Sequence, residues 1–385
     1  MEDDYPRLVK LFSRLQKLLR APVSSWFGYT YDIINAEDEP YLILANHNTD
    51  LDPVFLGLAV ERHCYFVATE NILRKESVAR FMKWVFDPII HYKGKTGTIS
   101  VKNILKTLRS GASVAMFAEG NRSFNGLTCP IAPATVKLAR KCGTNVVTYR
   151  FEGGYLTQPR WSSSFRRGRI TGKLIHVYTP AELKAMSDEA AYERICSDLF
   201  EDCYATQERD HVHYRGHALA EHLETALFMC PECGSFSTLH SKGDTLSCSE
   251  CGYKAVYDRE GYLNTCGVKH TVTEYDRSQL EGLRKAADDP DPAKVLFTDE
   301  TVLWEIGEDH RVRSKTPGKL TAFSGGFMFN DIYMKPSDLE GVALFSSNTI
   351  DLTIGGKQYE IHGAKDFCAL KYSYLYELLT DRNKE

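Results

Sequence analysis

The sequence predicts an α/β fold, a mostly parallel sheet with flanking helices, over residues 25–210, with smaller strand-rich units after it. Short apolar runs such as YLILAN (41–46) and SVAMFAE (113–119) alternate with segments of helical spacing such as SVKNILKTLRSG (100–111). Such alternation is typical of sheets whose parallel strands are joined by crossover helices. The 385 residues, 43% of them apolar, can bury enough surface for two or three domains.

Composition and charge narrow the range of partners. A net charge of −4 provides no global basic field, so we expect no nucleic acid as a partner. The longest apolar runs fall short of the roughly 18 residues that an ordinary membrane span needs. The acidic start, MEDDYPRLVK (1–10), lacks the apolar stretch of a signal peptide. Two C-x-x-C pairs indicate metal ligands rather than a disulfide framework, so we expect a reducing, cytoplasmic compartment.

Residues 1–24 are expected to hold a basic amphipathic helix. Arginines and lysines fill one side of the segment PRLVKLFSRLQKLLR (6–20), which has no acidic residue. Such a helix packs either on its own domain or on an anionic membrane surface, and the basic excess favours the membrane, at its inner face. The apolar side chains expected to contact lipid recur at helical spacing: Leu8, Leu11, Phe12, Leu15, Leu18 and Leu19.

A histidine with two nearby aspartates follows the first apolar run. His47 lies where a parallel sheet binds ligands, beyond the carboxyl end of a strand. A carboxylate that fixes the tautomer of a histidine makes it a better base. Asp52 can meet His47 only across a bend between loop and helix, which the segment NTD and Pro53 supply. Asp50 is the other candidate, and on this motif alone Asp52 would be interpreted as a simple helix cap.

A second cluster, FAEGNRSFNG (117–126), follows another predicted strand. Gly120 allows a tight turn there. Arg122 offers a planar fork of donors that suits a phosphate. The alternative for Arg122 is a surface salt bridge, for example with Glu119.

Together the two clusters resemble the glycerolipid acyltransferase superfamily typified by 1-acylglycerol-3-phosphate acyltransferases, over roughly residues 25–180. The family pattern Asn-His, four residues, then Asp, and the later pattern Glu-Gly-(Thr/Asn)-Arg-Ser, are matched by Asn46, His47, Asp52, Glu119, Gly120, Asn121, Arg122 and Ser123. The two patterns occur in the usual order, about seventy residues apart. Where the family often has an arginine between them, this chain has Lys93 and Lys95, and a lysine still attracts phosphate as a point charge. Lys93 is the candidate phosphate contact.

The resemblance implies acyl transfer in phospholipid synthesis. His47 would deprotonate the free hydroxyl of 1-acylglycerol-3-phosphate or a related lysophospholipid, and Asp52 would orient the imidazole. Arg122 would hold the phosphate, with the rest of the second pattern beside it and Glu119 positioning Arg122 or the glycerol. Asp50 would be a solvated or capping residue. The donor would be an acyl-CoA or an acyl carrier protein thioester.

An arginine-rich segment, RWSSSFRRGRITGK (160–173), is a candidate surface for anionic partners. Phospholipid headgroups, coenzyme A phosphates and an acidic acyl carrier protein would all fit a positive patch there. A solvated loop is the equally acceptable alternative.

Two C-x-x-C pairs predict a metal site in residues 211–268, which comprise a connector and a zinc ribbon. Each pair ends in glycine, and fourteen residues separate the pairs, a spacing typical of four-cysteine zinc sites. A zinc ion with four cysteine ligands has no open position, so its role is expected to be structural. The four ligands are Cys230, Cys233, Cys248 and Cys251.

Residues 269–385 read as a β-rich domain with a C-terminal helix, loosely similar to pleckstrin-like domains. A rival interpretation of the whole chain is a non-catalytic regulatory protein that binds through its zinc ribbon and carries a decayed acyltransferase domain. The ribbon segment contains two lysines and no arginine, so it lacks the basic footprint of a nucleic-acid reader.

Overall fold

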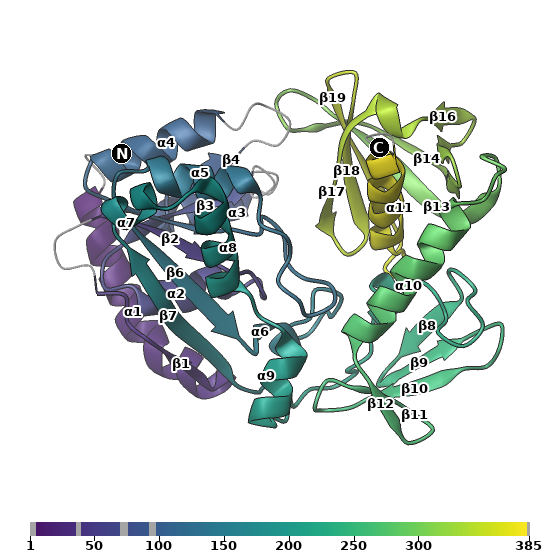
Figure 1. The fold of residues 1–385 in the computed structure, drawn as a ribbon, viewed down its shortest axis with the longest axis horizontal. Coiled ribbons are helices and arrows are strands. Elements are labelled where there is room, and N and C mark those ends of the chain that lie inside the picture. Colours follow the sequence, from purple (N-terminus) through teal and green to yellow (C-terminus); the bar gives the residue numbers. More distant parts are fainter. Residues whose placement is uncertain (1–4, 36–39, 70–75, 92–97, 383–385) are drawn as a thin grey trace. The chain divides into compact units, whose positions relative to one another are not determined.

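The computed structural model describes residues 5–35, 40–69, 76–91 and 98–382. The chain forms two compact units (Figure 1). Unit 1 comprises Met1–Pro159 and Phe165–Arg215, and unit 2 comprises Arg160–Ser164 and Gly216–Glu385. The N-terminal helix therefore belongs to the same unit as the α/β sheet.

The predicted mostly parallel sheet is confirmed in unit 1. Its seven strands lie in the order β1-β7-β6-β2-β5-β3-β4, and every neighbouring pair is parallel except β6 and β7. The strands are β1 (Tyr29–Tyr31), β2 (Tyr41–Ala45), β3 (Cys64–Thr69), β4 (Ile89–His91), β5 (Ser113–Phe117), β6 (Asn145–Glu152) and β7 (Ile170–Tyr178).

Helices cover both faces of this sheet, as a parallel sheet requires. Successive residues of β2 point to opposite faces, so Leu42 and Leu44 join one apolar cluster while Ile43 joins the other. The helices of unit 1 are α1 (Tyr5–Phe27), α2 (Asp52–Ala59), α3 (Glu76–Val85), α4 (Thr98–Arg109), α5 (Pro133–Lys141), α6 (Gly154–Thr157), α7 (Pro180–Ala185), α8 (Asp188–Leu199) and α9 (Cys203–Asp210).

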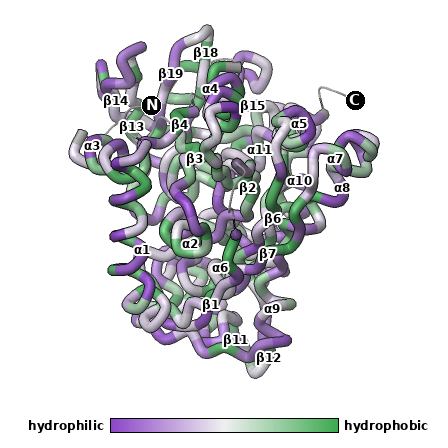
Figure 2. Tube along the Cα trace, turned by 90° about the vertical axis from the view of Figure 1, so that its left-hand side faces the viewer, coloured by the Kyte–Doolittle hydropathy of each residue, from purple (hydrophilic) through white to green (hydrophobic). Residues whose placement is uncertain are grey.

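Helix α1 corrects part of the membrane prediction. Figure 2 shows hydrophobic and hydrophilic residues alternating along it. Leu8 is 0% exposed and Phe12 is 4% exposed, because both pack into the apolar clusters of unit 1, so neither can contact lipid. Gln16 fastens the helix further by donating from Nε2 to the carbonyls of Gly57 (2.7 Å) and Val60.

The other four side chains that were predicted to contact lipid are either half-buried or exposed. Leu11, Leu15 and Leu19 are half-buried, whereas Leu18 is 69% exposed. No helix of the described ranges is both long enough and apolar enough to cross a membrane.

Unit 2 is strand-rich, as predicted. A short helix, η3 (Leu223–Thr225), precedes a five-stranded antiparallel sheet of β8 (Leu239–Lys242), β9 (Thr245–Cys248), β10 (Lys254–Tyr257), β11 (Leu263–Thr265) and β12 (Val268–His270). Helix α10 (Val272–Ala287) connects this sheet to the C-terminal β-rich part.

The C-terminal part of unit 2 is a second antiparallel sheet, of seven strands, followed by helix α11 (Ala369–Arg382). Its strands are β13 (Val295–Ile306), β14 (Val312–Phe323), β15 (Gly326–Phe329), β16 (Ile332–Met334), β17 (Leu339–Ser346), β18 (Thr349–Ile354) and β19 (Lys357–Gly363). The predicted β-rich domain with a final helix is confirmed, and the pleckstrin-like label stays a prediction.

Candidate active site and metal centre

The two sequence clusters meet at the carboxyl edge of the unit 1 sheet. Strands β2 and β5 are parallel neighbours, and Ala45 pairs with Phe117 at their ends. The pairing continues one residue further, where the Ala118 amide donates to the Ala45 carbonyl at 2.9 Å. The loops that follow the two strands therefore start side by side, which brings His47 and Glu119 together.

Asp52 lies beside His47, as predicted. The distance between His47 Nδ1 and Asp52 Oδ2 is 2.8 Å, and Asp52 is 1% exposed. Its carboxylate also accepts from the amides of Asn48 (2.5 Å) and Thr49 (2.9 Å), and from the Thr49 hydroxyl (2.6 Å). These bonds run back into the loop rather than forward into α2, whose N-cap Leu51 has no side-chain capping bond. Asp52 is therefore more than a helix cap.

The imidazole of His47 is held by its face as well as by its edge. Its ring stacks on Phe117, with centroids 4.4 Å apart and planes 19° apart. A carboxylate at Nδ1 selects the tautomer with the proton on that nitrogen, which leaves Nε2 as an acceptor. Within the described ranges Nε2 has no hydrogen-bond partner, and the side chain is 22% exposed. The ring thus presents a free basic nitrogen in a fixed orientation.

Glu119 supports the main chain of His47. One carboxylate oxygen accepts from the His47 amide and the other from the Cys129 amide, each at 2.5 Å. Burial raises the pKa of Glu119 to about 8, against the effect of these two bonds. The sequence predicts that Glu119 positions Arg122 or the glycerol, whereas both of its oxygens accept hydrogen bonds from main-chain amides.

Arg122 pairs with Asp50, the aspartate that the sequence predicts to be a solvated or capping residue. Its Nη2 lies 3.2 Å from Oδ1 of Asp50, so the ion pair that we considered with Glu119 forms with Asp50 instead. Asp50 is 63% exposed, as expected of a solvated residue, and Gln158 holds it through two further bonds of 2.9 Å. A phosphate that approaches Arg122 would therefore compete with an exposed carboxylate.

The remaining residues of the second pattern shape its turn. Gly120 has a φ of +64°, which only glycine adopts without strain. Asn121 is half-buried. Ser123 is 2% exposed, and its hydroxyl accepts from the amides of Asn125 and Gly126, so it stabilises the loop. The predicted phosphate contact of Lys93 lies outside the described residues.

Sequence reasoning missed a buried carboxylate that joins three loops of the site. Glu201 accepts from the side chain of Asn48 at 2.6 Å and from the Gly153 amide at 2.7 Å. Its main chain exchanges hydrogen bonds with Thr128, which follows the second pattern. Burial raises the pKa of Glu201 to about 8. Nothing in the sequence distinguishes this glutamate from its acidic neighbours.

The predicted positive patch at 160–173 does not form as a single free surface. Arg166 is 1% exposed and Arg160, which belongs to unit 2, is 7% exposed. Lys173 pairs with Glu152 at 2.7 Å, and Arg169 pairs with Asp210. Burial therefore makes two of the arginines inaccessible to an anionic partner, and two further basic side chains are already paired, whereas Arg167 is exposed.

The four predicted metal ligands converge in unit 2. Their Sγ atoms all lie within 4.8 Å of one another, with Cys230 and Cys251 3.6 Å apart and Cys233 and Cys248 3.8 Å apart. Four thiolates around a tetrahedral zinc lie about 3.8 Å from each other, so the set fits that ion. Each C-x-x-C turn closes through glycine at positive φ, where the Gly234 amide donates to the carbonyl of the first cysteine.

A match to a family model agrees with the geometry. Residues 29–152 match the family model "Acyltransferase". This segment contains β1 to β6 and both sequence patterns. A similar solved structure is the 1-acyl-sn-glycerophosphate (LPA) acyltransferase PlsC from Thermotoga maritima, with 17% sequence identity over 53% of this chain and 79% of that chain, and a TM-score of 0.40. The match of residues 29–152 to the family model confirms the resemblance to the acyltransferase family for this segment.

Proposed function

We propose that this protein transfers a fatty acyl group from an acyl thioester to the free hydroxyl of 1-acylglycerol-3-phosphate or a related lysophospholipid, in phospholipid synthesis. The observation that carries the proposal is the 2.8 Å contact between His47 Nδ1 and Asp52 Oδ2, which leaves Nε2 free. Both residues lie within the segment that matches the acyltransferase family.

The chemistry follows from this pair. Nε2 of His47 takes the proton of the acceptor hydroxyl as its oxygen attacks the thioester carbonyl. Asp52 stabilises the imidazolium that forms, because its carboxylate already accepts the Nδ1 proton. Collapse of the tetrahedral intermediate breaks the carbon–sulfur bond, and the imidazolium proton passes to the departing thiolate. One ester forms, one thioester is lost, and His47 returns to its neutral state.

Arg122 is the proposed anchor of the acceptor's phosphate. An arginine fork binds a phosphate through two parallel hydrogen bonds, whereas in the free protein Arg122 pairs with Asp50. Phosphate binding therefore exchanges one anionic partner for another. We assign Gly120 and Asn121 to the turn around the bound headgroup and Glu119 to the support of His47. The donor is acyl-CoA or an acyl carrier protein thioester.

Membrane contact is proposed for the outer face of α1, at the inner, cytoplasmic face of a membrane. Leu18 is 69% exposed and Trp26 is 41% exposed, and Arg14, Lys17 and Arg20 are exposed beside them. Basic residues around exposed apolar side chains suit an anionic lipid surface.

Vesicle flotation tests this contact. Replacing Leu18 with serine should weaken binding to phosphatidylglycerol vesicles by about tenfold, because the variant loses the burial of one leucine side chain. Ile332→Ser is the matched control, since Ile332 is 66% exposed but lies in unit 2. Equal losses in the two variants would argue against a specific role for α1.

The reaction itself is tested with the purified protein, liposomes, lysophosphatidate and either acyl-CoA or acyl carrier protein thioesters, with products identified by mass. His47→Ala should abolish diacyl product formation while the circular dichroism spectrum is unchanged. The exposed His217 offers a control, because His217→Ala should retain full turnover. Unchanged turnover in His47→Ala would refute the role of His47 as the base. No product from the wild type with any donor would favour the non-catalytic zinc-ribbon interpretation.

A further inference from the structure

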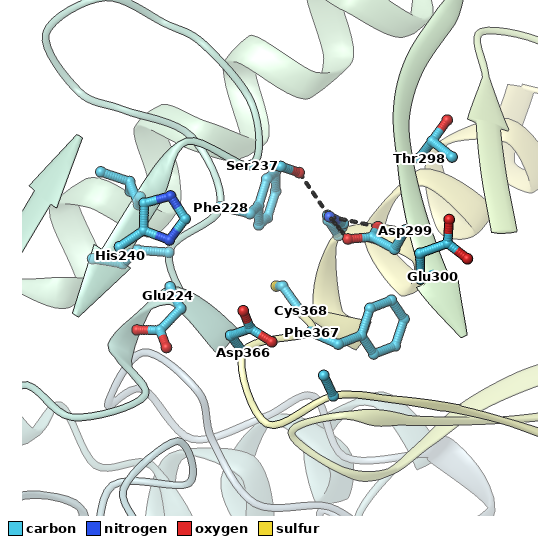
Figure 3. A pocket seen from close by; sticks show the side chains of 14 residues that line it. Glu224, Phe228, Ser237, His240, Thr298, Asp299, Glu300, Asp366, Phe367 and Cys368 are labelled. Atoms are coloured by element: carbon cyan, nitrogen blue, oxygen red, sulfur yellow. Dashed lines mark hydrogen bonds and ion pairs between the residues drawn. The ribbon is translucent and has the colours of Figure 1, made fainter. Parts of the chain in front are cut away.

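Unit 2 contains a cavity of about 300 Å³ that the proposed acyl transfer does not use (Figure 3). Its walls come from η3, β8, β13 and the segment that leads into α11. The volume lies at the lower end of the range for small-molecule sites. Several elements therefore enclose a space large enough for a small ligand.

Buried polar contacts fix the walls of the cavity. Lys371, 2% exposed, lies 2.7 Å from Oδ2 of Asp299 and donates to the Ser237 hydroxyl at 2.7 Å. Lys371 lies on α11. The dashed lines of Figure 3 reach Ser237, in the loop before β8, and Asp299, on β13. On another side, the Cys368 thiol donates to the Thr225 carbonyl at 3.1 Å. The cavity is thus held open by specific bonds.

The charge that remains in the cavity is negative. Lys371 neutralises Asp299, and Glu300 has Lys319 at 3.4 Å. Two carboxylates are left, those of Glu224 and Asp366, with an exposed histidine, His240, as the other basic group of the lining.

Glu224 lacks a complete set of partners. The residue is 8% exposed, and its Oε2 atom is buried without a hydrogen-bond partner in the described part of the chain. The other oxygen, Oε1, lies 4.0 Å from Nδ1 of His222. Burial raises the pKa of Glu224, and the nearby Asp366 carboxylate adds to this shift. An unpaired buried carboxylate is costly unless a cation or a donor reaches it.

The lining favours an organic cation over a metal ion. Among the described residues, the four cysteines alone form a cluster with the spacing of metal ligands, so Glu224, Asp366 and His240 are too spread out to bind one ion together. Two aromatic rings, Phe228 and Phe367, also line the space, and rings attract alkylammonium groups through their faces.

We propose that this cavity binds a small organic cation, with an ammonium group beside Glu224 and Asp366 and its carbon atoms against Phe228 and Phe367. The same chemistry is offered by a free amine in solution and by the ammonium headgroup of a lipid. The ligand is distinct from the substrates of acyl transfer, because every lining residue belongs to unit 2.

Thermal unfolding and calorimetric titration of the full chain test the charge requirement. Choline is the probe. Its control is 3,3-dimethylbutan-1-ol (dimethylbutanol), which has the same shape but no charge. Choline should raise the unfolding temperature of unit 2 saturably, and dimethylbutanol should not. Equal effects of the two compounds, or protection by magnesium chloride at the same concentration, would overturn the proposal.

Two substitutions locate the site. Glu224→Gln and Asp366→Asn should each weaken choline binding by about tenfold, the loss expected for one contact to a charged group. Glu281→Gln, at an exposed position of α10, is the matched control and should bind choline like the wild type. Unchanged affinity in Glu224→Gln would refute the assignment.

Stability in the absence of ligand separates a binding role from a structural one. Glutamine keeps an oxygen for the contacts on the Oε1 side and replaces only the oxygen that lacks a partner, so Glu224→Gln should unfold at the same temperature as the wild type or higher. A lower unfolding temperature together with unchanged choline affinity would assign Glu224 to the fold alone.

A final titration distinguishes the two sources of the ammonium group. Monomers of a short-chain phosphatidylcholine, below their micellar concentration, are compared with choline. Tighter binding of the lipid would assign the cavity to a headgroup, and equal binding would assign it to free amines. Failure of both ligands would overturn the proposal without affecting the acyl-transfer assay.

Discussion

Asp52 in unit 1 and Glu224 in unit 2 are both buried carboxylates, but their surroundings differ. Asp52 accepts four hydrogen bonds, from His47, Asn48 and twice from Thr49. Glu224 has one oxygen without any partner in the described ranges. The first carboxylate is satisfied by the protein itself, and the second awaits a partner from outside.

This difference extends to the two units. The imidazole and the two glutamates of the unit 1 site, Glu119 and Glu201, are held by hydrogen bonds within the chain, which gives a preorganised reaction site. In unit 2 four thiols converge on one point and Glu224 faces a cavity, so these groups become satisfied only when a metal ion or a cation binds. We therefore expect unit 2, and not unit 1, to depend on its ligands for stability.

Metal removal should show this contrast most strongly. Chelation by phenanthroline should unfold the sheet β8–β12, because structural zinc contributes on the order of 10 kcal/mol to small zinc domains. Amide hydrogen exchange should then speed up around Cys248, while the strands of unit 1 keep their protection. Metal content measured by mass spectrometry should fall in parallel, and Cys248→Ser should reproduce the effect. An equal loss of protection against amide exchange in both units would show that unit 2 does not depend on its metal more than unit 1 does.

The two aspartates of the first pattern offer the next test. Asp52→Asn should lower kcat by about 10³–10⁴-fold, because asparagine selects the wrong tautomer of His47 and leaves the imidazolium unstabilised. The same change should cost about 1–3 kcal/mol of stability, since the Thr49 hydroxyl and two amides lose a charged acceptor.

Asp50→Asn is the matched control, two residues away. It should leave kcat within about threefold and lower the KM for the phosphorylated acceptor, because Arg122 is released from an ion pair. Steady-state kinetics with varied acceptor measure both values. Comparable losses of kcat in the two variants would mean that the wrong carboxylate has been assigned.

The parts of both units that the sequence predicted are those encoded by short local patterns. His47 and Asp52 are five residues apart, and the cysteines of each C-x-x-C pair are three apart, so spacing limits their geometry. The alternation of strands and helices predicted the parallel sheet for the same reason. The periodicity of α1 predicted an apolar face, but the same pattern fits burial against lipid or against the sheet, and Leu8 and Phe12 pack on the sheet.

Contacts between residues that are distant in the sequence could not be predicted, because no short local pattern encodes them. Asp50 is close to His47 in the sequence, but it pairs with Arg122 only because the strands β2 and β5 are neighbours in the sheet. Glu201 is 153 residues from Asn48, and the cavity of unit 2 combines Glu224 with Asp366. In these cases the fold brings together ordinary acidic residues, whose roles are defined only by burial and by the partners that they meet.

Glu201 gives the most subtle test of preorganisation in unit 1. Glu201→Gln keeps the shape but places a donor against either Asn48 Nδ2 or the Gly153 amide, so one of these two hydrogen bonds is lost. The loop that carries His47 should shift slightly, lowering kcat by about tenfold with little change in KM.

The pH dependence of stability separates this positioning role from simple destabilisation. The pKa of Glu201 is raised from 4.5 to about 8, so the folded state holds a proton that the unfolded state releases. Its contribution to stability is present at low pH and is lost as the pH rises from about 4.5 through 8. Glutamine cannot ionise, so denaturant unfolding of Glu201→Gln should depend less on pH over this window, and its kcat should stay low at pH 6, where the wild-type residue is uncharged. Equal kcat values for Glu201→Gln and the wild type at pH 6 would show that charge, and not the hydrogen-bond geometry around Asn48, is what Glu201 provides.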